Sequence, residues 1–134
     1  MLNTCDSHLP GNVHPRGGGQ AEQHALHLGG GPTRIYCDLG FHFGASPDSV
    51  DFFEKVQKKV FGLKVYMNHT TGTLLIEDQK LLEKVFSSWP SHKVIMVHAE
   101  DLALEKAIKL AKKFKKKLHV CHLNLKSQLE MVKK

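Results

Sequence analysis

The stretch that decides the fold is residues 93–114, which read KVIMVHAEDLALEKAIKLAKKF. Its first part, from Lys93 to His98, is a short apolar run of the kind that forms a buried strand. From Glu100 to about Phe114, apolar residues recur at helical spacing. These are Leu102, Leu104, Ala107, Ile108 and Ala111. A strand followed directly by an amphipathic helix predicts one β/α unit.

The same unit recurs on both sides of this stretch. We expect strands at residues 35–45, 62–67 and 117–123, and helices after Ser46, over 77–89 and from Lys126 to Lys134. Ser46 is the predicted N-cap of the first of these helices, with Pro47 at its first position. Four alternations predict an α/β fold with parallel strands. Two architectures fit, an open doubly wound sheet or about half of a (β/α)8 barrel.

Composition narrows the class of protein. The chain has 134 residues, 41% apolar and 24% charged, which is typical of one globular domain. Three cysteines predict no disulfide framework, and no apolar run predicts a membrane span or a signal peptide. We therefore expect a cytoplasmic protein.

The net charge is +6, but only two of the 19 basic residues are arginines, and much of the excess positive charge lies at 112–117. That run is typical of a solvated helix end, so we expect no nucleic-acid partner.

The chain divides at about residue 33. Residues 1–33 are rich in Gly, His and Pro and show neither helical nor strand periodicity, so we expect an irregular segment. Their glycine runs follow no strand and match no phosphate-binding loop. Residues 34–134 contain all the β/α units. We therefore expect one partial barrel domain over 34–134.

Chemically active side chains lie within or at the ends of three consecutive strands of this domain. Lys64 lies within an apolar strand, the next strand ends at His98, and the one after it ends at Cys121 and His122. In both candidate architectures the active site lies beyond the carboxyl ends of the strands. A buried lysine needs a partner, a lowered pKa or a chemical modification such as carboxylation. Neutral imidazoles are natural zinc ligands, although a single strand histidine is more often structural.

These segments resemble dihydroorotase of the amidohydrolase superfamily over residues 34–134. The likeness is greatest to the dihydroorotase domain of the multifunctional pyrimidine-synthesis protein of animals and to bacterial relatives. Its motifs, in matching order and spacing, are Cys37-Asp38, Phe41-His42-Phe43-Gly44-Ala45-Ser46, Gly62-Leu63-Lys64-Val65-Tyr66-Met67-Asn68, Trp89-Pro90-Ser91-His92, Val97-His98-Ala99-Glu100 and Val120-Cys121-His122. The resemblance implies a (β/α)8 barrel that interconverts carbamoyl-aspartate and dihydroorotate in pyrimidine biosynthesis.

The resemblance also implies roles for individual residues. Lys64 matches the carboxylated lysine that bridges two zinc ions in the family, and His98 and His122 match the histidine ligands of the second zinc. Cys121 resembles a cysteine that lies beside the metal site. Thr70 matches the threonine of a mobile loop that closes over the substrate. The sequence Thr70-Thr71-Gly72 is more similar to the bacterial form of that loop.

Other parts of the family pattern are missing. The His-x-His motif of the first strand is absent, and neither His14 nor His42 reproduces it. The catalytic aspartate of the last strands is expected beyond Lys134. Residues 1–4, Met-Leu-Asn-Thr, weakly resemble a substrate-binding turn, which would make Asn3 a substrate contact. We therefore expect a fragment that is inactive by itself and that self-associates or assembles with other pyrimidine-pathway domains.

Three alternatives stay open at this point. The chain could belong to another cyclic amidohydrolase, such as a dihydropyrimidinase or an allantoinase, which shares the lysine and the histidines. It could be a catalytically dead barrel segment with a role in assembly. It could also be a basic binding module that uses residues 112–117. The motifs around Tyr66 and Trp89 favour dihydroorotase.

Overall fold

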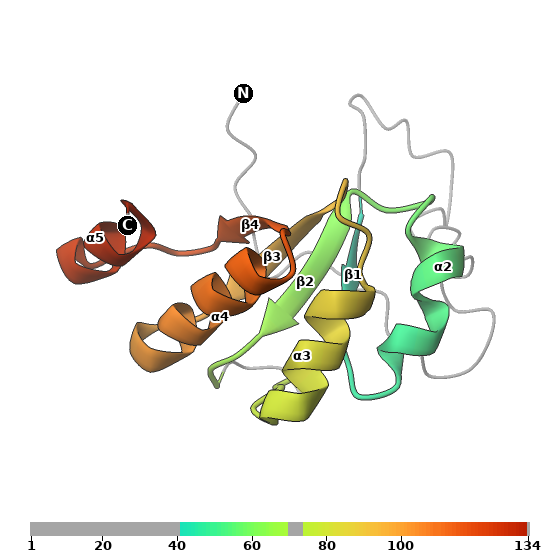
Figure 1. The fold of residues 1–134 in the computed structure, drawn as a ribbon, viewed down its shortest axis with the longest axis horizontal. Coiled ribbons are helices and arrows are strands. Elements are labelled where there is room, and N and C mark those ends of the chain that lie inside the picture. Colours follow the sequence, from blue (N-terminus) through green and yellow to red (C-terminus); the bar gives the residue numbers. More distant parts are fainter. Residues whose placement is uncertain (1–40, 70–73, 134) are drawn as a thin grey trace, which may run out of the picture.

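The computed structural model describes residues 41–69 and 74–133. Their core is one sheet of four parallel strands in the order β1-β2-β3-β4, which is also their order along the chain (Figure 1). The strands are β1 (His42–Gly44), β2 (Gly62–Tyr66), β3 (Val94–His98) and β4 (Lys117–Val120). This arrangement confirms the predicted parallel α/β fold.

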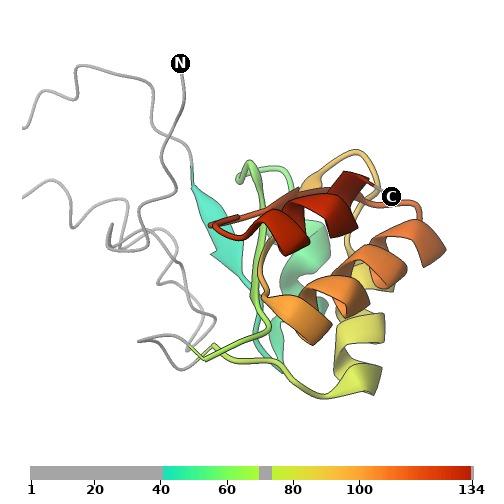
Figure 2. The ribbon, with the colours of Figure 1, turned by 90° about the vertical axis from the view of Figure 1, so that its left-hand side faces the viewer.

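A helical segment follows each strand. A 3-10 turn, η1 (Ser49–Phe52), leads into the short α2 (Phe53–Val56) after β1, and α3 (Gln79–Ser88) follows β2. The segment α4 (Asp101–Lys113) follows β3, and α5 (Lys126–Lys133) follows β4. Figure 2 shows α2, α3 and α4 on one side of the sheet. Among the described residues, no helix combines the length and the apolar character that crossing a membrane requires.

The hydrophobic core fills the space between the sheet and these helices. Alternate strand residues point into it, because successive side chains of a strand face opposite sides. On the strands these are Phe43, Leu63, Val65, Ile95 and Val97, all buried. The helices contribute Phe53, Leu82, Val85, Phe86, Leu104, Ala107 and Leu110. One face of the sheet therefore packs against the helices, and the other face carries a separate set of side chains.

Trp89 fixes the end of α3 against this core. Its side chain is fully buried, and its ring meets Phe53 edge to face with centroids 4.9 Å apart. Just beyond it, the Lys116 ammonium donates to the carbonyl oxygens of Ser87 and Trp89 and to Ser91 Oγ. These carbonyls belong to the helix C-terminus, where backbone acceptors lack partners within the helix. One basic residue of the 112–117 run is thus structural.

The start of the first helical segment differs from the sequence prediction. Ser46 was expected to cap a helix that begins at Pro47, but Pro47 and Asp48 form a turn and η1 begins at Ser49. The Ser46 carbonyl accepts hydrogen bonds from the Ser49 backbone N–H at 3.0 Å and the Ser49 hydroxyl at 2.8 Å. The prediction of a Ser46 side-chain cap is wrong, because the turn uses the Ser46 carbonyl and not its hydroxyl.

The other elements match the predicted ranges to within a few residues. The predicted helix at 77–89 is α3, whose N-cap Asp78 accepts a hydrogen bond from the Leu81 backbone N–H at 2.7 Å. The predicted strand at 117–123 ends earlier, at Val120. Residues 35–40 of the first predicted strand, and the whole segment 1–33, lie outside the described residues. The division at residue 33 stays a prediction.

Candidate functional site

The face of the sheet turned away from the core brings the predicted site residues together. Register pairing places Lys64 beside Met96 and Tyr66 beside His98. On the other side of Met96 lies His119, which is its partner on β4. We call this surface the open face; it comprises His42, Gly44, Gly62, Lys64, Tyr66, Val94, Met96, His98, Lys117 and His119. The register therefore places the strands predicted at 62–67 and 93–98 side by side, and a functional site there stays a prediction.

Lys64 lies at the centre of the open face and is 6% exposed. Its ammonium lies over the Tyr66 ring, with Nζ 5.0 Å from the ring centroid. Such a cation–π contact offsets part of the cost of removing an ammonium from water. The Lys64 ammonium makes no hydrogen bond or ion pair with any side chain or carbonyl of residues 41–69 and 74–133. Lys64 is thus a buried basic side chain whose partner among the described residues is an aromatic ring.

His98 lies between Tyr66 and His122. Its ring centroid is 6.2 Å from that of Tyr66 and 5.4 Å from that of His122. Burial lowers the pKa of His98 below 6.5, the positive charges of Lys64 and His122 lower it further, and Glu100 acts in the opposite direction. A lowered pKa keeps the imidazole neutral near pH 7, which is the form that can accept a proton or bind a metal ion.

Backbone and side-chain hydrogen bonds hold the carboxyl ends of β2 and β3 side by side. The Met67 N–H donates to the His98 carbonyl at 2.8 Å. One residue further on, the Asn68 Oδ1 accepts a hydrogen bond from the Glu100 N–H at 2.7 Å. These two bonds fix the place where His98 leaves its strand.

The third strand end is positioned by a turn. The Cys121 N–H donates to the Val97 carbonyl at 2.9 Å, and the Cys121 side chain is buried. The next residue, His122, has φ 57°, in the left-handed region. This conformation turns the chain out of the sheet and leaves the exposed imidazole of His122 beside His98. Thr70 and Asn3, also predicted as site residues, lie outside the described residues.

The described residues include three of the zinc-site residues that the resemblance implies. The His98 and His122 rings are neighbours, Lys64 acts electrostatically on His98, and imidazole nitrogens suit zinc. However, no three His, Cys, Asp or Glu side chains of residues 41–69 and 74–133 are grouped so that they could hold a metal ion. A complete centre needs ligands from elsewhere, so the zinc site stays a prediction.

Two further histidines, His42 and His119, lie on the open face, and neither was predicted as a site residue from the sequence. His42 is half-buried, and its Nδ1 atom is buried without a hydrogen-bond partner among the described residues. Burial lowers the pKa of His42, and the positive charges of Lys64 and His119 lower it further. Strand alternation could have placed both histidines opposite the core residues Phe43 and Leu118. Their closeness to Lys64 depends on the pairing of the strands, which alternation alone does not give.

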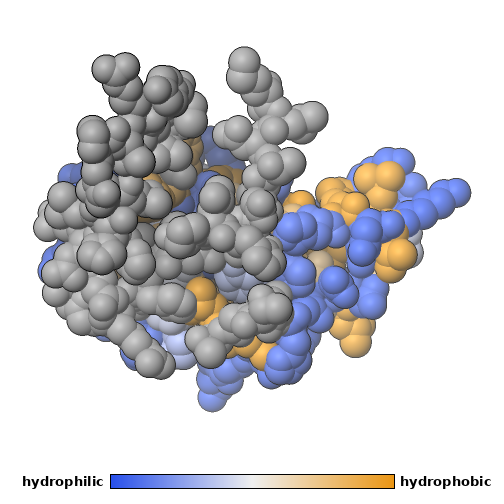
Figure 3. Space-filling view, turned by 180° about the vertical axis from the view of Figure 1, so that it is seen from behind, coloured by the Kyte–Doolittle hydropathy of each residue, from blue (hydrophilic) through white to orange (hydrophobic). Residues whose placement is uncertain are grey.

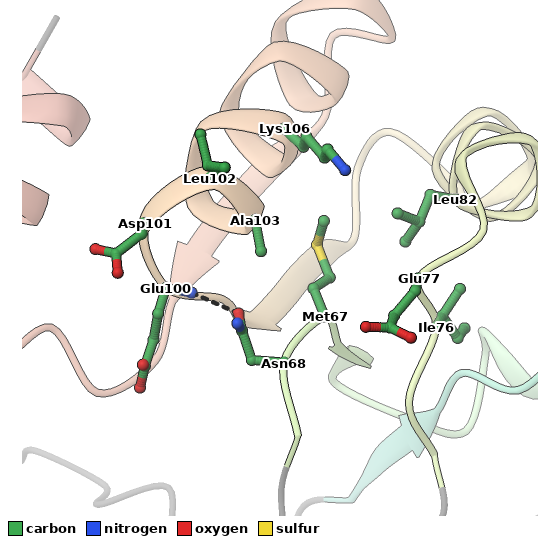
Figure 4. A pocket seen from close by; sticks show the side chains of 10 residues that line it. All are labelled: Met67, Asn68, Ile76, Glu77, Leu82, Glu100, Asp101, Leu102, Ala103 and Lys106. Atoms are coloured by element: carbon green, nitrogen blue, oxygen red, sulfur yellow. Dashed lines mark hydrogen bonds between the residues drawn. The ribbon is translucent and has the colours of Figure 1, made fainter.

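A separate cavity lies on the other side of the strand ends, between α3 and α4. Figure 4 shows Met67, Asn68, Glu77 and Glu100 around it, and its volume is about 320 Å³. Its remaining lining is Ile76, Leu82, Asp101, Leu102, Ala103 and Lys106. Its carboxylates are exposed, and its dashed hydrogen bond is the Asn68–Glu100 bond described above. The cavity therefore lies next to the open-face site but does not share its histidines.

The amino-acid sequence is similar to segments of two known multifunctional proteins. The chain is 31% identical over 97 residues to the multifunctional protein CAD of Squalus acanthias, a match that covers 72% of this chain and 4% of the shark protein. It is 26% identical over 102 residues to the multifunctional protein pyr1-3 of Dictyostelium discoideum, covering 75% of this chain and 5% of that protein. No protein-family model matches the chain.

A solved structure gives the same fold. It is the inactive dihydroorotase-like domain of the CAD-like multifunctional protein of Chaetomium thermophilum, with a TM-score of 0.67 and 24% identity. The likeness covers 84% of this chain and 31% of that domain's chain, so the described sheet corresponds to part of a larger barrel. The chain is a homologue of a short segment of the multifunctional proteins CAD and pyr1-3, and it has the fold of part of a dihydroorotase-like barrel domain.

Proposed function

We propose that this chain is a segment of a dihydroorotase-type amidohydrolase barrel and that it does not hydrolyse dihydroorotate by itself. The observation that supports the proposal is the placement of Lys64 within β2, His98 at the end of β3 and His122 just after β4, on three consecutive parallel strands. In barrels of this kind the carboxyl ends of the strands hold the catalytic groups. The substrate class is a cyclic amide, dihydroorotate, or its open form, carbamoyl-aspartate.

The three residues would supply part of a zinc centre. Zinc in such a site lowers the pKa of a bound water and polarises the amide carbonyl. His98, held neutral by burial and by Lys64, presents a free imidazole to such a centre together with His122. Tyr66 packs against both Lys64 and His98 and so holds them in place. Lys64, His98 and His122 would thus form one side of the site, and further residues would be needed to complete it.

Three observations support inactivity in isolation. The His-x-His motif and the catalytic aspartate of the family have no match in these 134 residues. General acid–base catalysis needs a proton carrier within hydrogen-bond reach of the reacting group, and the open face has no carboxylate on β1–β4. The structural neighbour with the same fold is itself described as an inactive domain. In the cell we expect the segment to work in the cytoplasm, joined to other pyrimidine-pathway domains.

Turnover assays test this proposal in two arms. The purified chain, supplied with zinc and bicarbonate, should consume dihydroorotate no faster than the buffer does. Mixing it with a complementary barrel portion that contains the His-x-His strand and the catalytic aspartate should produce turnover. That turnover should be lost with Lys64→Ala and kept with Lys106→Ala, which changes an exposed lysine. Hydrolysis by the chain alone, or complementation that survives Lys64→Ala, would refute the proposal.

The same mixture separates the related amidohydrolases. Allantoin and dihydrouracil, offered in place of dihydroorotate, should not be hydrolysed at a comparable rate. Faster turnover of either compound would assign the chain to an allantoinase or a dihydropyrimidinase.

A second candidate function is assembly, and the exposed face of α5 favours it. Leu125, Leu129 and Val132 are exposed at spacings of four and three residues, which places them on one side of the helix. Figure 3 shows apolar atoms gathered at the end of the molecule where α5 lies. We propose that this stripe contacts a neighbouring barrel segment. Sedimentation velocity should show self-association that Leu129→Glu reduces and Leu102→Glu, on α4, leaves unchanged; equal behaviour of the two variants would contradict a role for α5.

A further inference from the structure

The sheet has two edges at which a further strand can pair. Among residues 41–69 and 74–133, β1 pairs only with β2, and β4 pairs only with β3. An edge strand carries a row of backbone N–H and C=O groups that can pair with a strand of another chain. All four strands are parallel and stand in chain order, with α2, α3 and α4 on one side (Figure 2). A closed eight-stranded barrel has twice this number of strands and no edge.

Exposed apolar side chains gather at the same two ends of the sheet. Within the described residues, every exposed large apolar side chain except Leu102 belongs to the first or the last β/α unit. Those of the first unit are Phe52, on η1, and Phe61, which is 67% exposed and directly precedes β2. Those of the last unit, in or just before α5, are Leu123, Leu125, Leu129 and Val132. Figure 1 shows α2 and α5 at opposite ends of the sheet, so one chain carries two separate apolar surfaces.

The helical segments at the two ends begin with opposite charges. Each segment starts beyond the carboxyl end of the strand before it, so in a common barrel the starts of η1 and α5 lie at the same end. The start of the first segment carries the exposed Asp48 and Asp51. The segment α5 begins at the exposed Lys126 and has no acidic residue in its first turn. Side-by-side placement of η1 and α5 would therefore bring opposite charges together as well as apolar side chains.

We propose that two copies of this chain join head to tail into one closed barrel of eight parallel strands. The β4 edge of each copy pairs with the β1 edge of the other, and α5 of each copy packs beside η1 and α2 of the other. A twofold rotation about the barrel axis makes the two junctions identical, so no edge is left and the assembly stops at a dimer. This inference rests on the assembly role of α5 given above, and it names a second copy as the partner.

Sedimentation velocity of the full chain and its variants tests this closure. The wild type should sediment as a dimer. Leu129→Glu at one end and Phe52→Glu at the other should each raise the dissociation constant of the dimer by roughly tenfold or more, because every junction needs both surfaces. Phe61→Glu repeats the Phe52 test at a more exposed position. Leu102→Glu, on α4 between the two ends, is the matched control and should leave the dimer unchanged.

A mixture of two variants distinguishes this closure from other dimers. In a pair with one Leu129→Glu copy and one Phe52→Glu copy, one junction has both wild-type surfaces and the other has both changed surfaces. The mixture should therefore recover dimer at concentrations where either variant alone is a monomer. Circular dichroism of each variant checks that it is folded before mixing.

Three results would overturn the proposal. The first is a wild type that sediments as a monomer or as an open series of larger species. The second is a dimer that Leu129→Glu weakens but neither Phe52→Glu nor Phe61→Glu affects, because α5 would then pair with its own copy. The third is no recovery of dimer on mixing. A barrel made from two copies still lacks the His-x-His motif and the catalytic aspartate, so none of these outcomes depends on dihydroorotate turnover, and the two proposals can fail separately.

Discussion

The side-chain Oδ1 of Asn68 accepts a hydrogen bond from the backbone N–H of Glu100 at 2.7 Å, and this bond joins the carboxyl ends of two neighbouring strands. The Glu100 N–H stands at the N-cap of α4, where Glu100 itself makes no side-chain cap. Asn68 therefore serves from another strand as a partner for a backbone donor at the helix start. The same bond fixes the segment that follows His98.

Replacing Asn68 with alanine should destabilise the fold at this point. The variant leaves the Glu100 N–H without its acceptor, and the loss of such a bond costs about 1 kcal/mol. Urea denaturation of the wild type and Asn68→Ala would measure the difference in the free energy of unfolding. Asn124→Ala, also in an exposed loop after a strand, is the control and should cost less. Equal losses in the two variants would show that the Asn68 bond contributes nothing.

Two strand glycines should respond differently to a methyl group. At Gly62 a Cβ would lie 2.6 Å from Val94 Cγ1 and 2.7 Å from the Val94 carbonyl oxygen, so the backbones of β2 and β3 would have to separate. At Gly44 it would lie 3.0 Å from Leu74 Cδ1, which is the end of a flexible side chain. We expect Gly62→Ala to lower the free energy of unfolding by about 1–3 kcal/mol.

The control for that prediction is Gly44→Ala, measured by thermal unfolding in the same buffer. It should lose clearly less stability than Gly62→Ala, because Leu74 can move away. A larger loss at Gly44 would mean that the β2–β3 spacing is not as close as described.

Of the neighbouring lysines Lys112 and Lys116, only Lys116 should contribute to the free energy of unfolding. Burial lowers the pKa of Lys116, and its ammonium donates to the carbonyls of Ser87 and Trp89. Lys116→Met keeps the aliphatic length but removes these bonds, at a cost of about 1 kcal/mol. Lys112→Met, which changes an exposed side chain, should be neutral in the same denaturation experiment. A neutral Lys116→Met would contradict the role of this ammonium at the end of α3.

Stability should fall in mild acid because of the open-face histidines. The pKa values of His42 and His98 are lowered in the folded chain from the ordinary 6.5, so the folded state binds fewer protons than the unfolded state. Stability is then fully present above pH 6.5 and is lost as the pH falls through the folded-state pKa values. His42→Gln should reduce this dependence in denaturation curves collected between about pH 5 and 7.

The control for the pH prediction is His92→Gln, which changes an exposed side chain. Its free energy of unfolding should depend on pH as steeply as that of the wild type. A wild type with stability independent of pH over this range, or a His42→Gln variant with an unchanged slope, would contradict the burial of His42.

Sequence reasoning predicted the fold because the signals for it are local. The apolar runs at 62–67 and 93–98 identified β2 and β3, and helical spacing identified α3 and α4. It failed at Ser46, where a turn formed by the two residues after it delays the helix. It singled out Lys64, His98 and His122, because these residues lie within or just after strands and match a family pattern, and their roles stay predictions.

The same reasoning did not place His42 and His119 near Lys64. Alternation shows which face of a strand a residue occupies, but strand register decides which residues of different strands become neighbours. His119 reaches the row of Lys64 only through the pairing of Met96 with both strands beside it.

The measurement that tests the account most directly is the distance between imidazole protons of His98 and His122, observed as cross-relaxation in NMR spectra of the full chain. The centroids of the two rings are 5.4 Å apart, and that of Tyr66 is 6.2 Å from His98. We predict cross-peaks from His98 to both neighbours and their disappearance in His98→Ala. A folded chain that shows neither cross-peak would contradict the claim that three consecutive strands bring these residues to one site.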